Sequence, residues 1–175
     1  MPLPLGHAAV GFTVHHILNK DKPEISLWKI ILYTATLSNL PDVDVIIGLL
    51  VHGNGCFYHR GPTHSILFAL FSGLVAANLS RFWIQIPRMS FWICFSIILS
   101  HLLTDLIFTS SPVSLFWPLE VYWAMGYSGW IEVVSQICLR AFQDVGIISG
   151  CLLILFAKEL LSRFLNIPKS SLRKT

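Results

Sequence analysis

Apolar residues dominate this chain in long runs, separated by short polar or proline-containing segments. A run of about 20 apolar residues is long enough to cross a lipid bilayer as a helix. Four runs come near that length: Leu27–Val51, Ser65–Leu79, Phe91–Phe108 and Asp144–Leu161. The pattern predicts an all-α integral membrane protein with several spanning helices. The alternative is a soluble helical protein with a very apolar core.

The breaks between the runs predict where the helices begin and end. Pro41 should interrupt the second helix, because proline lacks an amide donor and clashes with the preceding turn. The glycine-rich stretch "HGNGCFYHRGP" predicts a loop, and Thr63 is expected to cap the helix that follows. The predicted helices cover residues 5–18, 26–41 with the half-helix 45–50, 63–82, 90–108 and 130–164.

The predicted fold class is therefore an all-α, multi-spanning transmembrane helical bundle with a broken second helix. Residues 1–175 form one membrane-embedded domain, and residues 166–175 form its polar, basic C-terminal tail. Composition agrees with this fold, since 54% of the residues are hydrophobic and only 12% are charged.

Composition also excludes several function classes. The chain carries no basic run interleaved with aromatic residues, so nucleic-acid binding has no support. The four cysteines lack the CxxC spacing of a zinc knuckle and are interpreted as buried thiols.

Basic residues are distributed unevenly between the two predicted sides of the membrane. If the helices alternate in direction, one side holds Lys20, Lys22, Lys29, Arg81, Arg88, Lys158, Arg163, Lys169, Arg173 and Lys174. The other side holds Arg60, and Arg140 lies near the start of the last helix. The positive-inside rule then predicts that the basic loops and the C-terminus are cytoplasmic.

Polar residues from four segments are expected to meet at one level of the membrane. At about 1.5 Å per helical residue from the basic end, His7, Asp42, His64, His101 and Asp105 reach similar depths. Ionisable side chains inside spans are energetically costly and usually functional. The pattern predicts a buried polar site in the extracytoplasmic half.

Two motifs within the spans suggest metal ligands. His101 and Asp105 are four residues apart, so they share one helix face as paired ligands would; a hydrogen-bonded pair is the alternative. In "NLPDVD", Asp42 and Asp44 repel one another unless a cation lies between them, although Asp42 could simply cap a helix.

The stretch "FYHRGPTHS" is the third motif. His59 and His64 flank a Gly-Pro turn, and a helix start together with Arg60 could hold a phosphate or carboxylate. A polar loop at the membrane surface is the alternative. His64 is the firmer ligand of the two histidines, whereas His59 and Arg60 are expected to face a substrate.

The candidate ligands comprise four imidazoles and three carboxylates: His7, Asp42, Asp44, His59, His64, His101 and Asp105. This mixture suits zinc first, with manganese or iron as alternatives, and it could hold one or two ions. His15 and His16 lie at the opposite end of the first helix and are excluded, and Glu120 is a further candidate near the membrane surface.

At these residues the chain resembles the YdjM-like family of membrane-bound, metal-dependent hydrolases. The matching elements are Gly6-His7, "LPDVD", "HRGPTHS", "SHLLTD" and "LFWP", from Gly6 to Pro118. A weaker similarity exists to zinc-dependent phospholipase C proteins, which are helical and use His and Asp ligands. Many YdjM-like proteins have a further histidine after the second Asp of the LPDxD element, where this chain has Val45. The resemblance implies an inner-membrane protein with metal-dependent hydrolase activity.

The resulting hypothesis is a membrane-embedded metallohydrolase of a lipid-borne or membrane-proximal phosphoester, with membrane lipids as partners. Asp42, His64, His101 and Asp105 would hold the metal, with His7, Asp44 or His59 completing the shell. Catalysis is assigned to Asp44 or His59 as general base and to Arg60; Arg60, Thr63 and Ser65 would bind the substrate anion. A metal-ion transporter and a non-catalytic membrane interaction protein are the alternatives.

Overall fold

Residues 4–19, 26–109, 111–119, 121 and 131–165 are described by the structure, a computed structural model. The predicted tail at 166–175 and the candidate Glu120 lie outside these residues. The described chain is helical, as predicted. Its elements are α1 (Pro4–Leu18), α2 (Leu27–Ser38), η1 (Leu40–Asp42), α3 (Val43–His52), η2 (Pro62–His64), α4 (Ile66–Leu79), α5 (Phe91–Phe108) and α6 (Ile131–Leu165).

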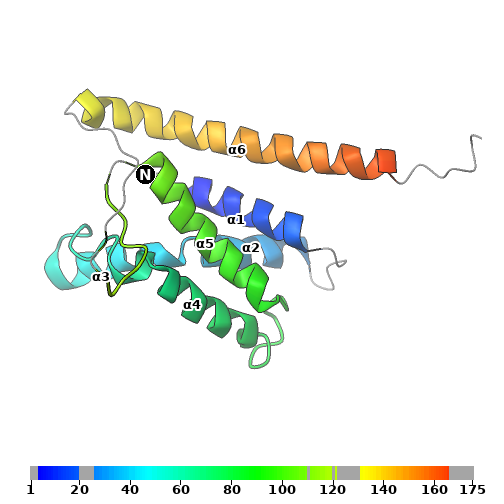
Figure 1. The fold of residues 1–175 in the computed structure, drawn as a ribbon, viewed down its shortest axis with the longest axis horizontal. Helices are drawn as coiled ribbons and strands as arrows, with labels where there is room; N and C mark the ends of the chain where they lie inside the picture. Colours follow the sequence, from blue (N-terminus) through cyan, green and yellow to red (C-terminus); the bar gives the residue numbers. More distant parts are fainter. Residues whose placement is uncertain (1–3, 20–25, 110, 120, 122–130, 166–175) are drawn as a thin grey trace, which may run out of the picture.

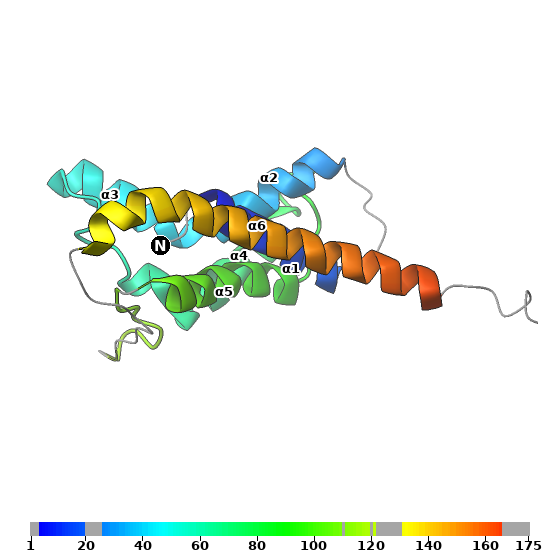
Figure 2. The same cartoon turned by 90° about the horizontal axis from the view of Figure 1, so that it is seen from above.

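Helix α5 is the centre of the bundle (Figure 1). It packs against α1, α2 and α4, and α6 packs along α1 on the outside of the bundle (Figures 1 and 2). Cys94, Ile97, Ile98 and Leu102 on α5 are fully buried. The opposite face of α6 exposes large apolar side chains such as Leu152, which suits contact with lipid.

The second helix is broken where Pro41 predicts it. Helices α2 and α3 meet at an angle of 53°, and the turn η1 between them contains Pro41. The amide of Asp42 donates to the carbonyl of Asn39 at 3.2 Å. The carbonyl of Ser38, four residues before Asp42, is therefore left for another donor.

The prediction that Thr63 caps the helix after the glycine-rich loop is wrong. Helix α4 begins at Ile66, and the Ser65 hydroxyl accepts a hydrogen bond from the Phe68 amide at 3.1 Å. Thr63 lies within the 3-10 turn η2, and its hydroxyl donates to Asp44 instead. Ser65 has the extended backbone of an N-cap, which a residue inside a 3-10 turn lacks.

Among the described residues, two helical segments are long and apolar enough to cross a membrane: Phe91–Phe108 and Asp144–Ser162. The bent pair α2–α3 makes a third if it counts as one span. The fourth expected span, at Ser65–Leu79, is instead the shorter apolar helix α4. The prediction of a multi-spanning bundle is confirmed with two or three candidate spans.

The basic links share one end of the bundle. Figure 1 shows that α1 ends, α2 begins, α4 ends, α5 begins and α6 ends at this end. We call it the basic end, because it carries Lys29, Arg81, Arg88 and Lys158 among the described residues. The predicted grouping is confirmed for these residues, and its cytoplasmic orientation stays a prediction.

Candidate metal centre

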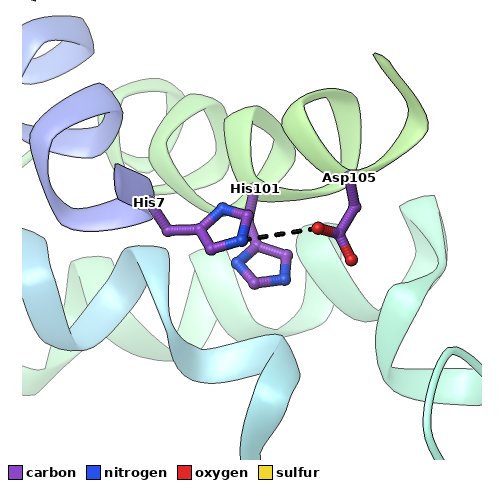
Figure 3. Close-up of side chains that lie close together, drawn as sticks. All are labelled: His7, His101 and Asp105. Carbon is purple, nitrogen blue, oxygen red and sulfur yellow. Dashed lines mark ion pairs between the residues drawn. The ribbon is translucent and has the colours of Figure 1, made fainter. Parts of the chain in front are cut away.

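Helices α1 and α5 bring three of the predicted ligands together away from the basic end. His101 and Asp105 lie on one face of α5, and the imidazole of His7 stacks on that of His101 with ring centroids 3.8 Å apart. His7 Nε2 is 3.4 Å from Asp105 Oδ1 (Figure 3). All three side chains are buried, and together they could hold a metal ion.

The helix break adds the carboxylate of Asp42 to this group. Asp42 Oδ1 lies 3.4 Å from His101 Nε2 and 3.5 Å from His64 Nε2. Asp42 follows Pro41 directly, and the turn η1 contacts both α5 and η2. The bend that proline imposes therefore places this side chain in the site.

Asp44 fastens the "HRGPTHS" loop to the broken helix. Its Oδ2 accepts hydrogen bonds from the Arg60 amide at 3.2 Å and from the Thr63 hydroxyl at 2.5 Å. Its Oδ1 accepts from His59 Nδ1 at 3.1 Å, and His64 Nδ1 is 3.3 Å from Oδ2. One buried carboxylate thus fixes the orientation of both imidazole rings of the loop.

The hydrogen bonds of His101 and His64 determine which ring nitrogen is free. His101 Nδ1 is 2.6 Å from the Ser38 carbonyl, which can only accept, so Nδ1 carries the proton. His64 Nδ1 faces the Asp44 carboxylate, which requires the same tautomer. In the neutral imidazoles both Nε2 atoms are therefore unprotonated acceptors. Metal-bound histidines typically donate their other N–H to a carbonyl or carboxylate in this way.

Three acceptor atoms consequently face one another. The distances among Asp42 Oδ1, His64 Nε2 and His101 Nε2 are 3.4, 3.4 and 3.5 Å. A tetrahedral zinc ion with ligands at about 2.0–2.2 Å would separate its ligand atoms by about 3.3–3.6 Å. We call these three atoms the acceptor triangle. Its dimensions and its chemistry both fit a metal cation.

Unsatisfied polar atoms around the triangle support the same fit. Both nitrogens of His7, both oxygens of Asp105 and Oδ1 of Asp42 are buried without a hydrogen-bond partner among the described residues. Such groups are costly to bury unless another interaction compensates. The three carboxylates Asp42, Asp44 and Asp105 also exceed the single guanidinium of Arg60 by two charges, which a divalent cation would balance.

The electrostatics of His64 point the same way. His64 lies on the turn η2, between the helices α3 and α4. Burial by itself lowers the pKa of its imidazole, but the nearby carboxylates of Asp42, Asp44 and Asp105 outweigh burial and raise the pKa. The surroundings of this ring therefore stabilise positive charge.

Arg60 lies inside the cluster with its side chain turned toward α5. Its Nε is 3.5 Å from Asp105 Oδ2, and its Nη1 donates to the Ser111 carbonyl at 3.0 Å. Its φ of 70° is in the left-handed region, which costs about 1–2 kcal/mol for a residue other than glycine. The contacts with Asp44, Asp105 and Ser111 hold it there, and its predicted role in binding a substrate stays a prediction.

The hydroxyls of Thr63 and Ser65, predicted to bind substrate, have local partners. Thr63 donates to Asp44, and Ser65 donates to the Pro62 carbonyl at 2.6 Å while capping α4. Both therefore shape the loop in this structure. Their predicted role toward a substrate is not tested by these contacts.

Two of the candidate ligands are partly exposed. The side chain of Asp42 is 15% exposed and that of His59 is 12% exposed, whereas the other candidate ligands are almost fully buried. These two partly exposed side chains belong to the η1 turn and to the "HRGPTHS" loop.

The structure separates the remaining histidines from this cluster. The three candidate metal groups found among the described residues are His7–His101–Asp105, Asp42–His64–His101 and Asp44–His59–His64. All seven predicted ligands occur in them, and His64 and His101 each belong to two groups. His15 pairs with Asn19 near the end of α1, and His52 stacks on Phe57, so neither joins the groups.

Asp144 on α6 supports the site although the motifs did not identify it. Its Oδ2 accepts a hydrogen bond from the Gly6 amide at 3.2 Å, directly before His7. The carboxylate is buried and lies near the start of α1, where the helix dipole favours negative charge. The sequence feature that could have identified Asp144 is its position as an acidic residue at the edge of an apolar run.

Replacing Gly6 with alanine should destabilise the protein by about 1–3 kcal/mol through overpacking. A Cβ at this position would lie 2.6 Å from Asp144 Oδ1, so either the Asp144 side chain or the first turn of α1 must shift. Gly146→Ala on α6 is the matched control, because its Cβ would meet no atom within 4 Å. Thermal unfolding in detergent measures the difference, and equal melting temperatures for the two variants would contradict the expected contact.

Comparisons with known proteins agree with this geometry. The family model described as "YdjM inner membrane protein" matches residues 1–164. The Inner membrane protein YbcI of Escherichia coli (strain K12) is 34% identical over 124 residues, which cover 67% of this chain and 68% of that protein. No solved structure matches the chain.

Proposed function

The chain belongs to the YdjM family of inner membrane proteins, and we propose that it is a membrane-embedded, metal-dependent hydrolase. The acceptor triangle of Asp42, His64 and His101 carries this proposal. Three buried acceptors at 3.4–3.5 Å, with no donor between them, repel one another unless a cation lies among them.

Zinc is the metal that the donor set favours, with manganese or iron as alternatives. Imidazole and carboxylate donors suit these ions, and three protein ligands with one open position are typical of catalytic zinc. Asp105 lies beside the triangle, 3.7 Å from His64 Nε2, and supplies a fourth ligand or a second ion's ligand together with His7. A bound ion of this kind lowers the pKa of a coordinated water and polarises an ester oxygen.

His59 and Asp44 are placed to move a proton. Asp44 accepts from His59 Nδ1, which fixes the orientation of the imidazole, and an oriented imidazole can take a proton from water. The side chain of His59 is 12% exposed, so water can reach this residue. We assign His59 as general base and Asp44 as the group that orients it.

The substrate class follows from charge and location. Arg60 is the cation of the cluster and can donate to a phosphate oxygen, since guanidinium binds phosphate with two donors. The site lies away from the basic end, and the positive-inside rule then places it in the extracytoplasmic half of the membrane. A lipid-borne or membrane-proximal phosphoester can reach it there.

Metal analysis of protein purified in detergent without chelator tests whether the protein binds a metal ion. We expect near-stoichiometric zinc, manganese or iron. Chelation should lower the melting temperature, because an ion at 100 times its Kd stabilises the folded state by about 2.7 kcal/mol. Protein that contains no transition metal and binds none on addition would refute the proposal.

Assays with phosphoester substrates test whether the metal-loaded protein is a hydrolase. Wild-type protein loaded with Zn²⁺ or Mn²⁺ should release product from lipid or soluble phosphoesters, whereas Asp105→Ala should not. A metal-loaded protein that hydrolyses none of a panel of mono- and diesters would favour a non-catalytic role. Metal uptake by proteoliposomes containing the protein would favour a transporter.

A further inference from the structure

A second polar site lies at the basic end of the bundle, where α4 ends and α5 begins. A cavity of about 400 Å³ is lined there by Ala77, Ser80, Arg81, Arg88, Met89 and Ser90. The metal cluster lies toward the other end of the same helices, at His101 and Asp105 of α5 and before the start of α4. The proposed hydrolase therefore does not use this cavity.

The lining of the cavity is suited to an anion. The two guanidinium groups, Arg81 and Arg88, are exposed, and neither forms an ion pair with any residue that the structure describes. Ser90 caps α5, so the positive end of an 18-residue helix adjoins them. Two guanidinium groups beside a helix N-terminus match the charge and geometry of a phosphate.

The residues next to the cavity place it at a membrane surface. Phe82, Trp83 and Ile84 follow Arg81 directly and are 89%, 64% and 86% exposed. Three consecutive apolar side chains of this exposure are unfavourable in water, whereas tryptophan and its apolar neighbours are stabilised in the interfacial layer of a bilayer. The arginines would then lie at the level of the lipid headgroups.

An apolar groove is lined by residues that neighbour those of the cavity in the sequence. It has a volume of about 320 Å³ and is lined by Leu67, Leu70, Phe71, Leu74 and Phe91. Phe91 follows Ser90 of the cavity, and Leu74 lies three residues before Ala77, which puts them on neighbouring positions of one α4 face. A polar cavity with an apolar groove at neighbouring positions matches a headgroup with its acyl chain better than a free phosphate.

We propose that Arg81 and Arg88 bind the phosphate of an anionic phospholipid, whose acyl chain lies in the groove between α4 and α5. The lipid comes from the leaflet that the basic end faces. Basic residues near a membrane surface attract anionic lipids, and a defined cavity adds selectivity for one bound molecule. The site is a lipid-binding site separate from the metal cluster.

Native mass spectrometry of the full chain in detergent tests this proposal with phosphatidylglycerol and phosphatidylcholine of equal chain length. We expect one phosphatidylglycerol to bind preferentially, and the Arg81→Gln/Arg88→Gln protein to bind it about tenfold or more weakly. The charge-matched control is Lys169→Gln/Arg173→Gln in the tail, which should bind as the wild type does. Circular dichroism and metal content should be unchanged in both proteins, since Arg81 and Arg88 are exposed and far from the cluster.

Three outcomes would overturn the proposal. Both lipids carry an anionic phosphate, so equal binding would show that the net negative charge of the headgroup is not recognised. An equal loss in the tail control would show that only total charge matters. Displacement of the lipid by inorganic phosphate at comparable concentration would show a free-anion site in place of a lipid site. Arg81→Lys/Arg88→Lys should bind with intermediate strength, because lysine keeps the charge and loses the paired donors.

Discussion

Replacing His64 with alanine should remove the metal ion from the protein. His64 contributes Nε2 to the acceptor triangle and belongs to two of the three candidate metal groups. Loss of a residue that only orients a ligand costs about 10–100-fold in metal affinity, and loss of a ligand itself should exceed that range. We therefore expect His64→Ala to be purified with no more than trace metal.

The measurement is metal content per protein, together with melting temperature with and without chelator. His16→Ala is the matched control, because His16 is an exposed histidine near the basic end of α1. Wild-type and His16→Ala proteins should lose stability on chelation, and His64→Ala should not respond. Full metal occupancy in His64→Ala would show that the acceptor triangle is not the metal site.

The sequence predicted which residues belong to the cluster better than it predicted the hydrogen bonds among them. Depth along each helix depends only on residue number, so His7, His64, His101 and Asp105 could be placed at one level. Hydrogen-bond partners depend on how the helices pack. The roles of Asp44, which fixes the loop, and of Ser38, whose carbonyl fixes His101, required the structure.

Two expectations differ from the structure, and one residue that supports the site was missed. Thr63 and Ser65 are equally good capping residues by type, and the 3-10 turn at Pro62 decided between them. The run Ser65–Leu79 is apolar throughout, yet the helix ends at Leu79 and remains shorter than a span. Asp144 belongs to no motif, and only the packing of α6 on α1 brings it to Gly6.

One proline connects the backbone to the proposed chemistry. Pro41 bends the second helix and leaves the Ser38 carbonyl free to accept from His101 Nδ1, which makes His101 Nε2 an acceptor. The same bend points Asp42 at that nitrogen. The helix break thus fixes the position of one corner of the acceptor triangle, Asp42, and the protonation of another, His101.

Replacing Asp44 with alanine should destabilise the protein and weaken metal binding together. Its buried carboxylate accepts from the Arg60 amide, the Thr63 hydroxyl and His59, and it faces His64 Nδ1. Removing one partner from a buried charged network costs about 3–5 kcal/mol, because the remaining donors lose their acceptor. Chemical or thermal unfolding of the chelated protein measures this loss without a contribution from the metal.

Asp44→Asn separates the two roles of this residue. The amide keeps the shape and one oxygen acceptor for Arg60 and Thr63, so the chelated protein should retain more of its stability than Asp44→Ala. It loses the charge that orients His64 and His59, so metal affinity should fall by about 10–100-fold and hydrolysis should fall with it. Thr63→Val is the control for the loop, since it removes one donor to Asp44 and leaves the carboxylate facing both histidines. Asp44→Ala protein with wild-type stability after chelation would refute the anchoring role, and Asp44→Asn with wild-type metal affinity would refute the orienting role.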